Sequence, residues 1–260
     1  MRIILKAEIL EHKEQAANIF LLKVAAPAIA QTATPGQFCM LTPLAREHST
    51  DPLLKRPLSI HSVNKDTVSF LYRCMGSGTH LLSTKKIGED LELIGPLGHG
   101  FDLTRKSYIL VGGGMGIAPL LFTAQALTAQ NKMPIVLIGA RSALELPSVV
   151  LKAFEDCAKG LHITTEDGSL GEKGLVTTSL IGLLRQKMPD AVLSCGPWPM
   201  LKAVNASAQQ HNISCEVSLE AHMACGVGAC LGCAIKAAGE GYLHVCKDGP
   251  VVNSKLVDWS

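Results

Sequence analysis

The sequence comprises 260 residues, enough for one large domain or, more usually at this length, two modest ones. Its 24 lysine and arginine residues nearly balance 22 aspartate and glutamate residues, giving a formal net charge of +2. This balance excludes the strongly basic surface needed to neutralise many phosphates. We therefore expect neither nucleic acid nor an anionic membrane surface as a partner.

The mean hydropathy of +0.26 is high and requires either a membrane segment or strands buried on both faces. The longest apolar run, residues 109–122, is interrupted by glycines and a proline and is shorter than the ~20 residues of a membrane span. Parallel strands buried on both faces therefore explain the high mean hydropathy better than a membrane span does. Arg2, Lys6 and Glu8 stand where a signal peptide would have its apolar core, so we expect a cytoplasmic protein without a membrane span.

The first part of the chain has the pattern of short strands separated by turn residues. We expect strands at residues 37–41, 57–62, 67–73 and 91–94. This pattern predicts a small antiparallel β-barrel over residues 1–103.

From residue 104 the pattern changes to strands and helices in alternation. We expect strands at residues 108–111, 134–139, 161–165 and 191–195, and helices at residues 118–130, 148–159, 177–187 and 198–210. Such alternation with apolar strands predicts a doubly wound parallel sheet over residues 104–212. Residues 213–260 form a third segment, in which glycines and cysteines replace regular periodicity. It is too short to form a stable hydrophobic core without a cross-link such as a bound metal.

Four cysteines crowded near the C-terminus give the strongest local signal. Cys225, Cys230, Cys233 and Cys246 have the C-x4-C-x2-C...C spacing of a plant-type [2Fe-2S] site. The intervening glycines allow unusual backbone angles and let N–H groups approach the sulfurs. The alternatives are a structural zinc site, which usually has paired short spacings, and a group of buried thiols. An odd total of nine cysteines without an export signal disfavours disulfides.

A glycine-rich loop follows the first strand of the α/β part. Residues 112–119 read Gly-Gly-Gly-Met-Gly-Ile-Ala-Pro, which fits G-x-G-x-x-P rather than the usual pattern with a third glycine. A pyrophosphate in such a loop accepts hydrogen bonds from free N–H groups at the positive end of the helix dipole. A simple tight turn is the alternative. The residues expected to bind NAD here are Gly112, Gly114, Gly116 and Pro119.

Two later strand ends are candidates to complete this site. Cys195-Gly196-Pro197 closes a strand at the edge where α/β sheets bind ligands, so Cys195 and Gly196 are candidates to face the nicotinamide. The turn of residues 165–168, Thr-Glu-Asp-Gly, places the carboxylates of Glu166 and Asp167 where the adenosine ribose would lie, and Asp167 is the residue expected to bind it. Carboxylates accept hydrogen bonds from ribose hydroxyls and repel a 2′-phosphate, which favours NAD over NADP. The alternatives are a buried thiol and a solvated acidic turn.

The barrel part carries polar groups that suit a dinucleotide of its own. Arg56-Pro57-Leu58-Ser59 lies on an expected strand, Tyr72-Arg73 ends the next one, and residues 76–79 open a helical turn. Two arginines and a helix start make a pyrophosphate clamp, and Ser59 is a candidate to bond a flavin edge. Taken alone, such arginines are more often surface or ion-paired residues.

Taken in order, R-P-L-S, G-x-G-T, G-G-G-x-G-x-A-P, C-G-P and the four cysteines resemble the ferredoxin–NADP reductase superfamily with an appended [2Fe-2S] module. More narrowly, the chain resembles the electron-transfer subunits of dihydroorotate dehydrogenase type B, and residues 220–233 carry the most specific part of the likeness. The resemblance implies an FAD-binding barrel (1–103), an NAD-binding α/β domain (104–212) and a cluster module (213–260). The residues that it implies for FAD are Arg56, Pro57, Leu58, Ser59, Leu71, Tyr72, Arg73, Gly78 and Thr79, and those for iron are Cys225, Cys230, Cys233 and Cys246. Cys39 and Cys74 stand where many relatives have an apolar residue; the resemblance assigns them no role, and either thiol could alter the sensitivity to oxidation.

In that family, two such subunits join two FMN-containing catalytic subunits, and electrons from dihydroorotate pass through FMN, cluster and FAD to NAD. The implied function is therefore electron transfer in pyrimidine biosynthesis, with no catalytic acid–base pair or nucleophile in this chain. FAD suits the middle position, because nicotinamide exchanges hydride, a cluster exchanges single electrons and a flavin does both. A subunit serving a hydrogenase or another NAD(P)-linked oxidoreductase is one alternative, and a zinc-stapled interaction protein is another.

Overall fold

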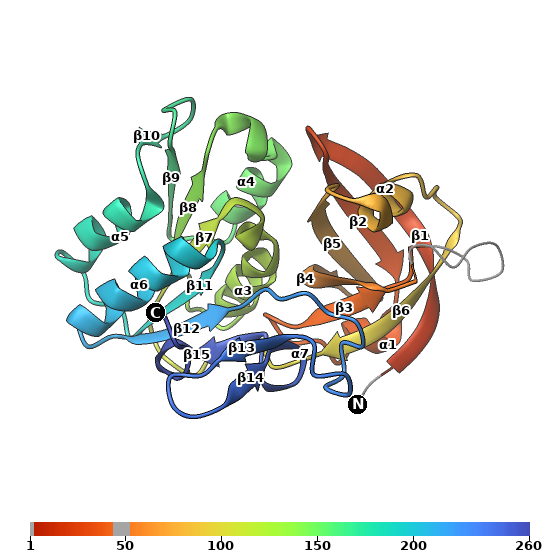
Figure 1. The fold of residues 1–260 in the computed structure, drawn as a ribbon. Coiled ribbons are helices and arrows are strands. Elements are labelled where there is room, and N and C mark those ends of the chain that lie inside the picture. Colours follow the sequence, from red (N-terminus) through yellow and green to blue (C-terminus); the bar gives the residue numbers. More distant parts are fainter. Residues whose placement is uncertain (1–2, 44–52) are drawn as a thin grey trace.

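The computed structural model describes residues 3–43 and 53–260. A β-barrel and an α/β unit lie side by side, and the C-terminal segment runs along one edge of both (Figure 1). Residues 1–2, where the charged N-terminal segment begins, lie outside the described residues. Within the described ranges, no helix is long and apolar enough to cross a membrane.

The N-terminal part is a closed barrel with the strand order β1-β2-β5-β4-β3-β6, in which all neighbours are antiparallel. Its elements are β1 (Ile3–Ala16), β2 (Ile19–Ala25), α1 (Pro27–Ala30), β3 (Phe38–Leu41), β4 (Arg56–Asn64), β5 (Thr67–Arg73), α2 (Ser77–Ser83) and β6 (Asp90–Leu97). Strand periodicity divides β5: Phe70 and Tyr72 lie in the barrel core, whereas Leu71 packs against the α/β unit. The predicted antiparallel barrel is confirmed.

The α/β unit is a seven-stranded sheet with the order β10-β9-β8-β7-β11-β12-β15, parallel except between β12 and β15. Its first elements are β7 (Tyr108–Gly113), η1 (Gly114–Gly116), α3 (Ile117–Ala129), β8 (Ile135–Ala140), η2 (Ala143–Glu145), α4 (Ser148–Glu155), β9 (Gly160–Thr165), β10 (Glu172–Lys173), α5 (Val176–Leu184), β11 (Ala191–Cys195) and α6 (Trp198–Gln210). Buried residues of α3 and α4 pack on one face of the sheet, and those of α5 and α6 pack on the other. This arrangement confirms the predicted doubly wound sheet.

The sheet brings together two loops that are far apart in the sequence. From β7 the chain winds outward to β8 and β9 and then crosses to β11 on the other side of β7. As a result, Cys195 at the end of β11 is in register with Gly112 of β7. Ligands of such sheets bind beyond the carboxyl ends of the strands at this reversal, so the glycine loop and the C-G-P segment lie at the expected place.

Two helices end earlier than the sequence predicts. Helix α4 stops at Glu155 rather than at residue 159, because the Lys159 N–H already donates to the Pro134 carbonyl as the chain enters β9. Helix α5 stops at Leu184 rather than at residue 187. Pro189 follows closely, and the residue before a proline is disfavoured in a helical conformation.

The C-terminal segment is partly woven into the sheet. Strands β12 (Ser214–Ser218) and β15 (Val251–Asn253) are sheet strands, although both come after residue 212. Between them lie a hairpin of β13 (Ala234–Lys236) and β14 (Tyr242–His244) and helix α7 (Val245–Asp248); η3 (Ser254–Leu256) follows β15. The division at residues 103 and 212 therefore stays a prediction, and its third part shares a sheet with the second.

Candidate functional site

Four cysteine sulfurs are arranged around a glycine loop after β12. Cys225, Cys230 and Cys233 lie on the loop, and Cys246 lies on α7. The Sγ atoms of Cys233 and Cys246 are 3.3 Å apart. Positive φ angles at Gly226 (69°) and Gly228 (82°) turn the backbone so that its N–H groups point inward.

Backbone N–H groups donate to three of these sulfurs. The N–H groups of Val227 and Cys230 each lie 3.4 Å from Cys225 Sγ, and that of Gly228 lies 3.1 Å from Cys246 Sγ. The Cys246 N–H lies 3.4 Å from Cys233 Sγ. Such donors favour thiolates, which are the ligands that iron requires.

Burial and hydrogen bonding act in opposite directions on the loop cysteines. Burial raises the pKa of the Cys225 thiol, but hydrogen bonds from the Val227 and Cys230 N–H groups outweigh it and bring this pKa down to about 6. Cys233 and Cys246 are buried, whereas Cys230 is exposed. The sulfurs therefore span from the protein interior to the surface, as a relay between an internal and an external redox group requires.

The cysteine spacing is that of a [2Fe-2S] site, in which four thiolates are divided between two irons. Among the described residues, no group of three His, Cys, Asp or Glu side chains is placed to hold a single metal ion. The spacing and the inward N–H groups therefore fit the cluster.

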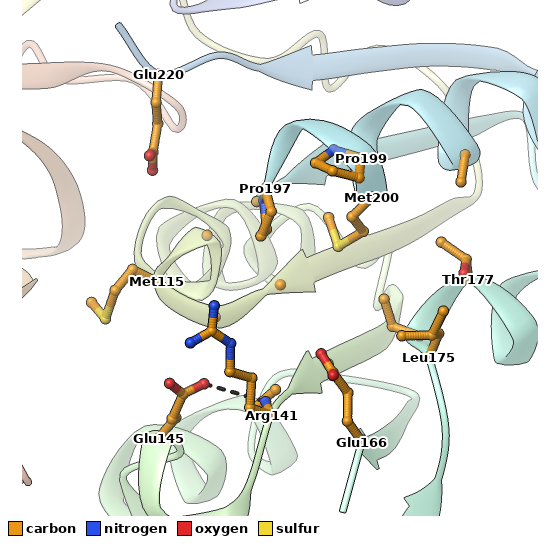
Figure 2. A pocket seen from close by; sticks show the side chains of 18 of the residues that line it. Met115, Arg141, Glu145, Glu166, Leu175, Thr177, Pro197, Pro199, Met200 and Glu220 are labelled. Carbon is orange, nitrogen blue, oxygen red and sulfur yellow. Dashed lines mark hydrogen bonds between the residues drawn. The ribbon is translucent and has the colours of Figure 1, made fainter. Parts of the chain in front are cut away.

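A cavity of about 690 Å³ opens at the reversal point of the sheet, where the barrel faces the α/β unit (Figure 2). This volume lies in the range of cofactor pockets. Its walls include the glycine loop, the ends of β8 and β9, the segment after β11, and Arg73 of the barrel. Of the residues expected to bind NAD, Gly114, Gly116 and Gly196 line the cavity.

The glycine loop leaves room for a ligand at one position and for a neighbouring backbone at another. Gly114 has φ 52°, and a Cβ atom built on it would meet nothing within 4 Å. A Cβ atom on Gly116 would instead overlap the Cys195 carbonyl and come within 2.6 Å of the Gly196 nitrogen. Gly114 thus offers open space for a phosphate, and Gly116 lets the two loops touch.

Four residues expected to bind NAD do not line the cavity. Gly112 is buried against the start of α3, and Pro119 is buried within the first turn of that helix. Cys195 is buried at the end of β11, where burial raises the pKa of its thiol. The Asp167 carboxylate accepts hydrogen bonds from the Ser169 N–H (2.9 Å) and hydroxyl (2.6 Å) and shapes its own turn. Glu166, the preceding residue, lines the cavity instead.

The cavity contains charged groups that our sequence analysis did not select as binding residues. Glu166 belongs to the acidic turn predicted at the ribose, where Asp167 was selected, and Arg141 follows β8, so the rule that ligands bind at strand ends could have found it. Glu220, after β12, points into the cavity from the opposite side, and burial raises the pKa of its carboxyl group (Figure 2). Glu145 of η2 also lines the cavity, and nothing in the local sequence marks it.

The residues expected to hold FAD divide between two faces of the barrel. Ser59 and Arg73 do not belong to the barrel core, and the Ser59 hydroxyl has no partner among the described residues. Leu58 packs against that core, and the Tyr72 hydroxyl lies 2.9 Å from His12 Nε2. Leu58 and Tyr72 therefore have only backbone groups to offer a flavin on the outer face.

Arg56 lies against the helix that the G-x-G-T residues open. A Cβ atom on Gly78 would overlap the Arg56 guanidinium, so the Arg56 side chain packs directly against the backbone of α2. The Thr79 hydroxyl accepts hydrogen bonds from the N–H groups of Met75 (2.9 Å) and Gly76 (3.1 Å) and fixes the first turn of α2. In the part of the chain that the structure describes, the Arg73 Nε is buried without a hydrogen-bond partner.

Comparison with known proteins supplies the family. A sequence model described as "Iron-sulfur cluster binding domain of dihydroorotate dehydrogenase B" matches residues 220–258. The protein named "Dihydroorotate dehydrogenase B (NAD(+)), electron transfer subunit" from Caldanaerobacter subterraneus subsp. tengcongensis is 38% identical over 255 residues, covering 96% of this chain and 97% of its own. The protein of the same name from Bacillus velezensis is 37% identical over 258 residues, with 95% of each chain covered. This chain belongs to their family.

Solved structures agree with that assignment. An NADH-dependent reduced ferredoxin-NADP oxidoreductase, studied for flavin-based electron bifurcation, superposes with a TM-score of 0.85 at 29% identity, over 97% of this chain and 90% of its own. A Neisseria gonorrhoeae ferredoxin NADP+ reductase with bound FAD and NADP has the same fold, with a TM-score of 0.66 at 17% identity over 80% and 91% of the two chains. The family resemblance predicted from the sequence is thus confirmed. NAD-linked electron transfer as a subunit of dihydroorotate dehydrogenase B is the function of this family.

Proposed function

We propose that this chain carries electrons from a catalytic partner subunit to NAD through a [2Fe-2S] cluster and FAD. The segments proposed to hold FAD, NAD and the cluster are residues 1–103, 104–212 and 213–260. The partner is an FMN-containing dihydroorotate dehydrogenase subunit, joined as a heterotetramer of two plus two chains in the cytoplasm. The observation that carries the proposal is the adjacency of all three sites within one chain.

The cluster loop lies directly on the barrel. A Cβ atom on Gly226, beside Cys225, would come within 2.5 Å of the Met40 side chain on β3. Cys233 and Cys246 belong to one buried apolar cluster with Phe38 and Met40 of the barrel, whereas Cys230 is exposed. This arrangement suits a path in which electrons enter the cluster from a partner at the exposed side and leave it toward the barrel.

The cavity lies on the side of the barrel from which Arg73 projects, and Arg73 forms part of its wall. When bound, FAD exchanges single electrons with the cluster and hydride with nicotinamide. The chain's own residues bind and align the two dinucleotides: Arg56 and Arg73 are proposed for FAD, and the N–H groups around Gly114 for the NAD pyrophosphate. Backbone contact between the loops of Gly116 and Cys195 holds the nicotinamide side in place.

The test is an anaerobic visible spectrum of the purified chain, with counts of iron, sulfide and flavin, before and after addition of NADH. Flavin bands and a [2Fe-2S] signature that bleach with NADH are expected. A colourless protein that carries zinc would overturn the proposal.

The partner is tested separately by co-purification from cells. Recovery with an FMN-containing dihydroorotate dehydrogenase subunit in a one-to-one ratio is expected. Recovery with a hydrogenase subunit, and without an FMN protein, would contradict the proposed partner while leaving electron transfer intact.

A further inference from the structure

One carboxylate in the cavity contacts both halves of the molecule. Glu145 Oε1 accepts a hydrogen bond from Arg73 Nη1 of the barrel at 3.0 Å. Glu145 Oε2 accepts the backbone N–H of Arg141 at 3.2 Å, drawn as the dashed line in Figure 2. Among the described residues, Arg73–Glu145 is the ion pair that joins a barrel strand to the α/β unit.

Arg73 contacts Glu145 through its guanidinium, whereas Arg141 contacts it only through its backbone N–H. Arg73 donates to Glu145 through one nitrogen, and its buried Nε has no partner within residues 3–43 and 53–260. A guanidinium has five N–H donors in a fixed plane, so Arg73 retains donors for a flavin dinucleotide. The Glu145 bond fixes the direction in which those donors point.

Arg141 is held by its backbone and not by its side chain. Its side chain points into the cavity, toward the loop that carries Met115 (Figure 2), and its guanidinium has no partner among the described residues. An unpaired cation facing free loop N–H groups complements an anion such as a pyrophosphate. By accepting the Arg141 N–H, Glu145 fixes the backbone position from which the Arg141 side chain extends.

The alternative is that Arg73–Glu145 only holds the two domains together. The two side chains are 27% and 20% exposed, so the pair is partly solvated. Partly exposed ion pairs contribute little to stability. Extensive apolar packing, which includes Leu71 of the barrel and α3 of the α/β unit, already joins the domains.

We infer that Glu145 is a positioning residue that sets the flavin-side Arg73 and the NAD-side Arg141 in a fixed relation, and so aligns the two dinucleotides for hydride transfer. This inference rests on the proposed function. Hydride moves from a nicotinamide carbon to a flavin nitrogen, or back, as one bond breaks and the other forms. Displacements of about 1 Å in such alignments cost on the order of a hundredfold in rate.

The experiment uses the purified chain with FAD and cluster bound, and compares Glu145→Gln and Glu145→Ala with wild type. Glutamine keeps an oxygen that can accept the Arg141 N–H but loses the charge that pairs with Arg73. Three quantities are measured: bound FAD per chain, NADH affinity, and the rate of flavin bleaching at saturating NADH. The long-wavelength absorbance of a nicotinamide ring stacked on a flavin is recorded as well, since a purely structural role would not change it.

We expect Glu145→Ala to retain FAD and to lose at least tenfold in the saturating bleaching rate, together with the stacking absorbance. Glu145→Gln should fall between Ala and wild type. Glu155→Ala, which removes an exposed carboxylate that pairs with Lys152 on α4, is the matched control and should match wild type.

Two results would overturn the inference. One is bleaching and stacking absorbance at the wild-type level in both variants. The other is loss of FAD or of the fold in Glu145→Gln as well as in Glu145→Ala, which would show a structural role. Wild-type protein that holds FAD but does not bleach with NADH would instead contradict the proposed function itself.

Discussion

Gly116 of the glycine loop lies directly against the carbonyl group of Cys195, so that no side chain fits between them. The two loops meet because β7 and β11 are neighbours in the sheet. We expect Gly116→Ala to push the loops apart and to weaken NADH binding at least about tenfold, or roughly 1.4 kcal/mol. Titration of NADH against the holoprotein measures this, and FAD and iron content should stay unchanged.

Gly182→Ala is the control for that substitution. Gly182 lies within α5, and a Cβ atom there meets nothing within 4 Å. Alanine should therefore leave NADH binding unchanged and stabilise the protein by about 0.5–1 kcal/mol, because glycine is unfavourable inside helices. Equal NADH affinity in Gly116→Ala and wild type would show that contact between the loops does not shape the site.

The cluster cysteines should be separable from the FAD and NAD sites. Cys233→Ser removes a buried sulfur that lies 3.3 Å from Cys246 Sγ, and we expect it to abolish the [2Fe-2S] absorbance. Bleaching of FAD by NADH should persist, because no cluster cysteine lines the cavity.

Cys157→Ser is the matched change at a buried cysteine on the far side of the sheet from the cluster, where Sγ bonds the Ala153 carbonyl. It should keep the cluster at the wild-type level. Retained iron and sulfide in Cys233→Ser would contradict the ligand set, as would stoichiometric zinc in place of iron in the wild-type chain.

The preference for NAD over NADP should depend on Glu166 rather than on Asp167. Glu166 lines the cavity, whereas the Asp167 carboxylate is engaged by Ser169 in its own turn. Removing a carboxylate that repels a 2′-phosphate favours NADP. We expect Glu166→Gln to raise the NADPH/NADH affinity ratio about tenfold, or roughly 1.4 kcal/mol, and Asp167→Asn to leave it unchanged. The reverse ranking in NADH and NADPH titrations would restore Asp167 as the ribose contact.

Regular elements of this chain were predictable because their periodicity is local. The bounds of β5, β11 and α6 agree with the expected ranges 67–73, 191–195 and 198–210. Strand β12 was missed because Ser214-Cys-Glu-Val-Ser is short and half polar, and its place in the sheet depends on pairing with β11. Sheet neighbours distant in sequence leave no periodic signal.

The cofactor sites also combine local sequence signals with contacts that only the fold creates. The cysteine spacing and the glycine loop each lie within a short stretch of sequence and could be recognised directly. Glu145 meets Arg73 across 72 residues, and nothing near either residue indicates the pair. The direction in which Tyr72 points also follows from barrel closure, which sends it to the core and leaves Arg73 outside.

Protonation of His61 at acidic pH should weaken the packing of the barrel against the α/β unit. His61 is buried on β4, and its Nδ1 lies 2.8 Å from the Ala118 carbonyl of α3. Burial lowers the pKa of His61 from 6.5 to about 4, although the hydrogen bond to Ala118 opposes this. The folded protein therefore binds fewer protons than the unfolded chain between these values, so stability is lost as pH falls from about 6.5 toward 4.

Because the folded state keeps this imidazole neutral, the free energy of unfolding falls by about 3 kcal/mol over that pH range, since one pKa unit corresponds to about 1.4 kcal/mol. His61→Asn keeps a donor near the Ala118 carbonyl but cannot titrate. Its free energy of unfolding should therefore fall less steeply with acid than that of wild type, and urea unfolding at pH 7.5 and pH 5 measures the difference. Parallel pH dependence in the two proteins would mean that His61 is protonated in the fold without penalty.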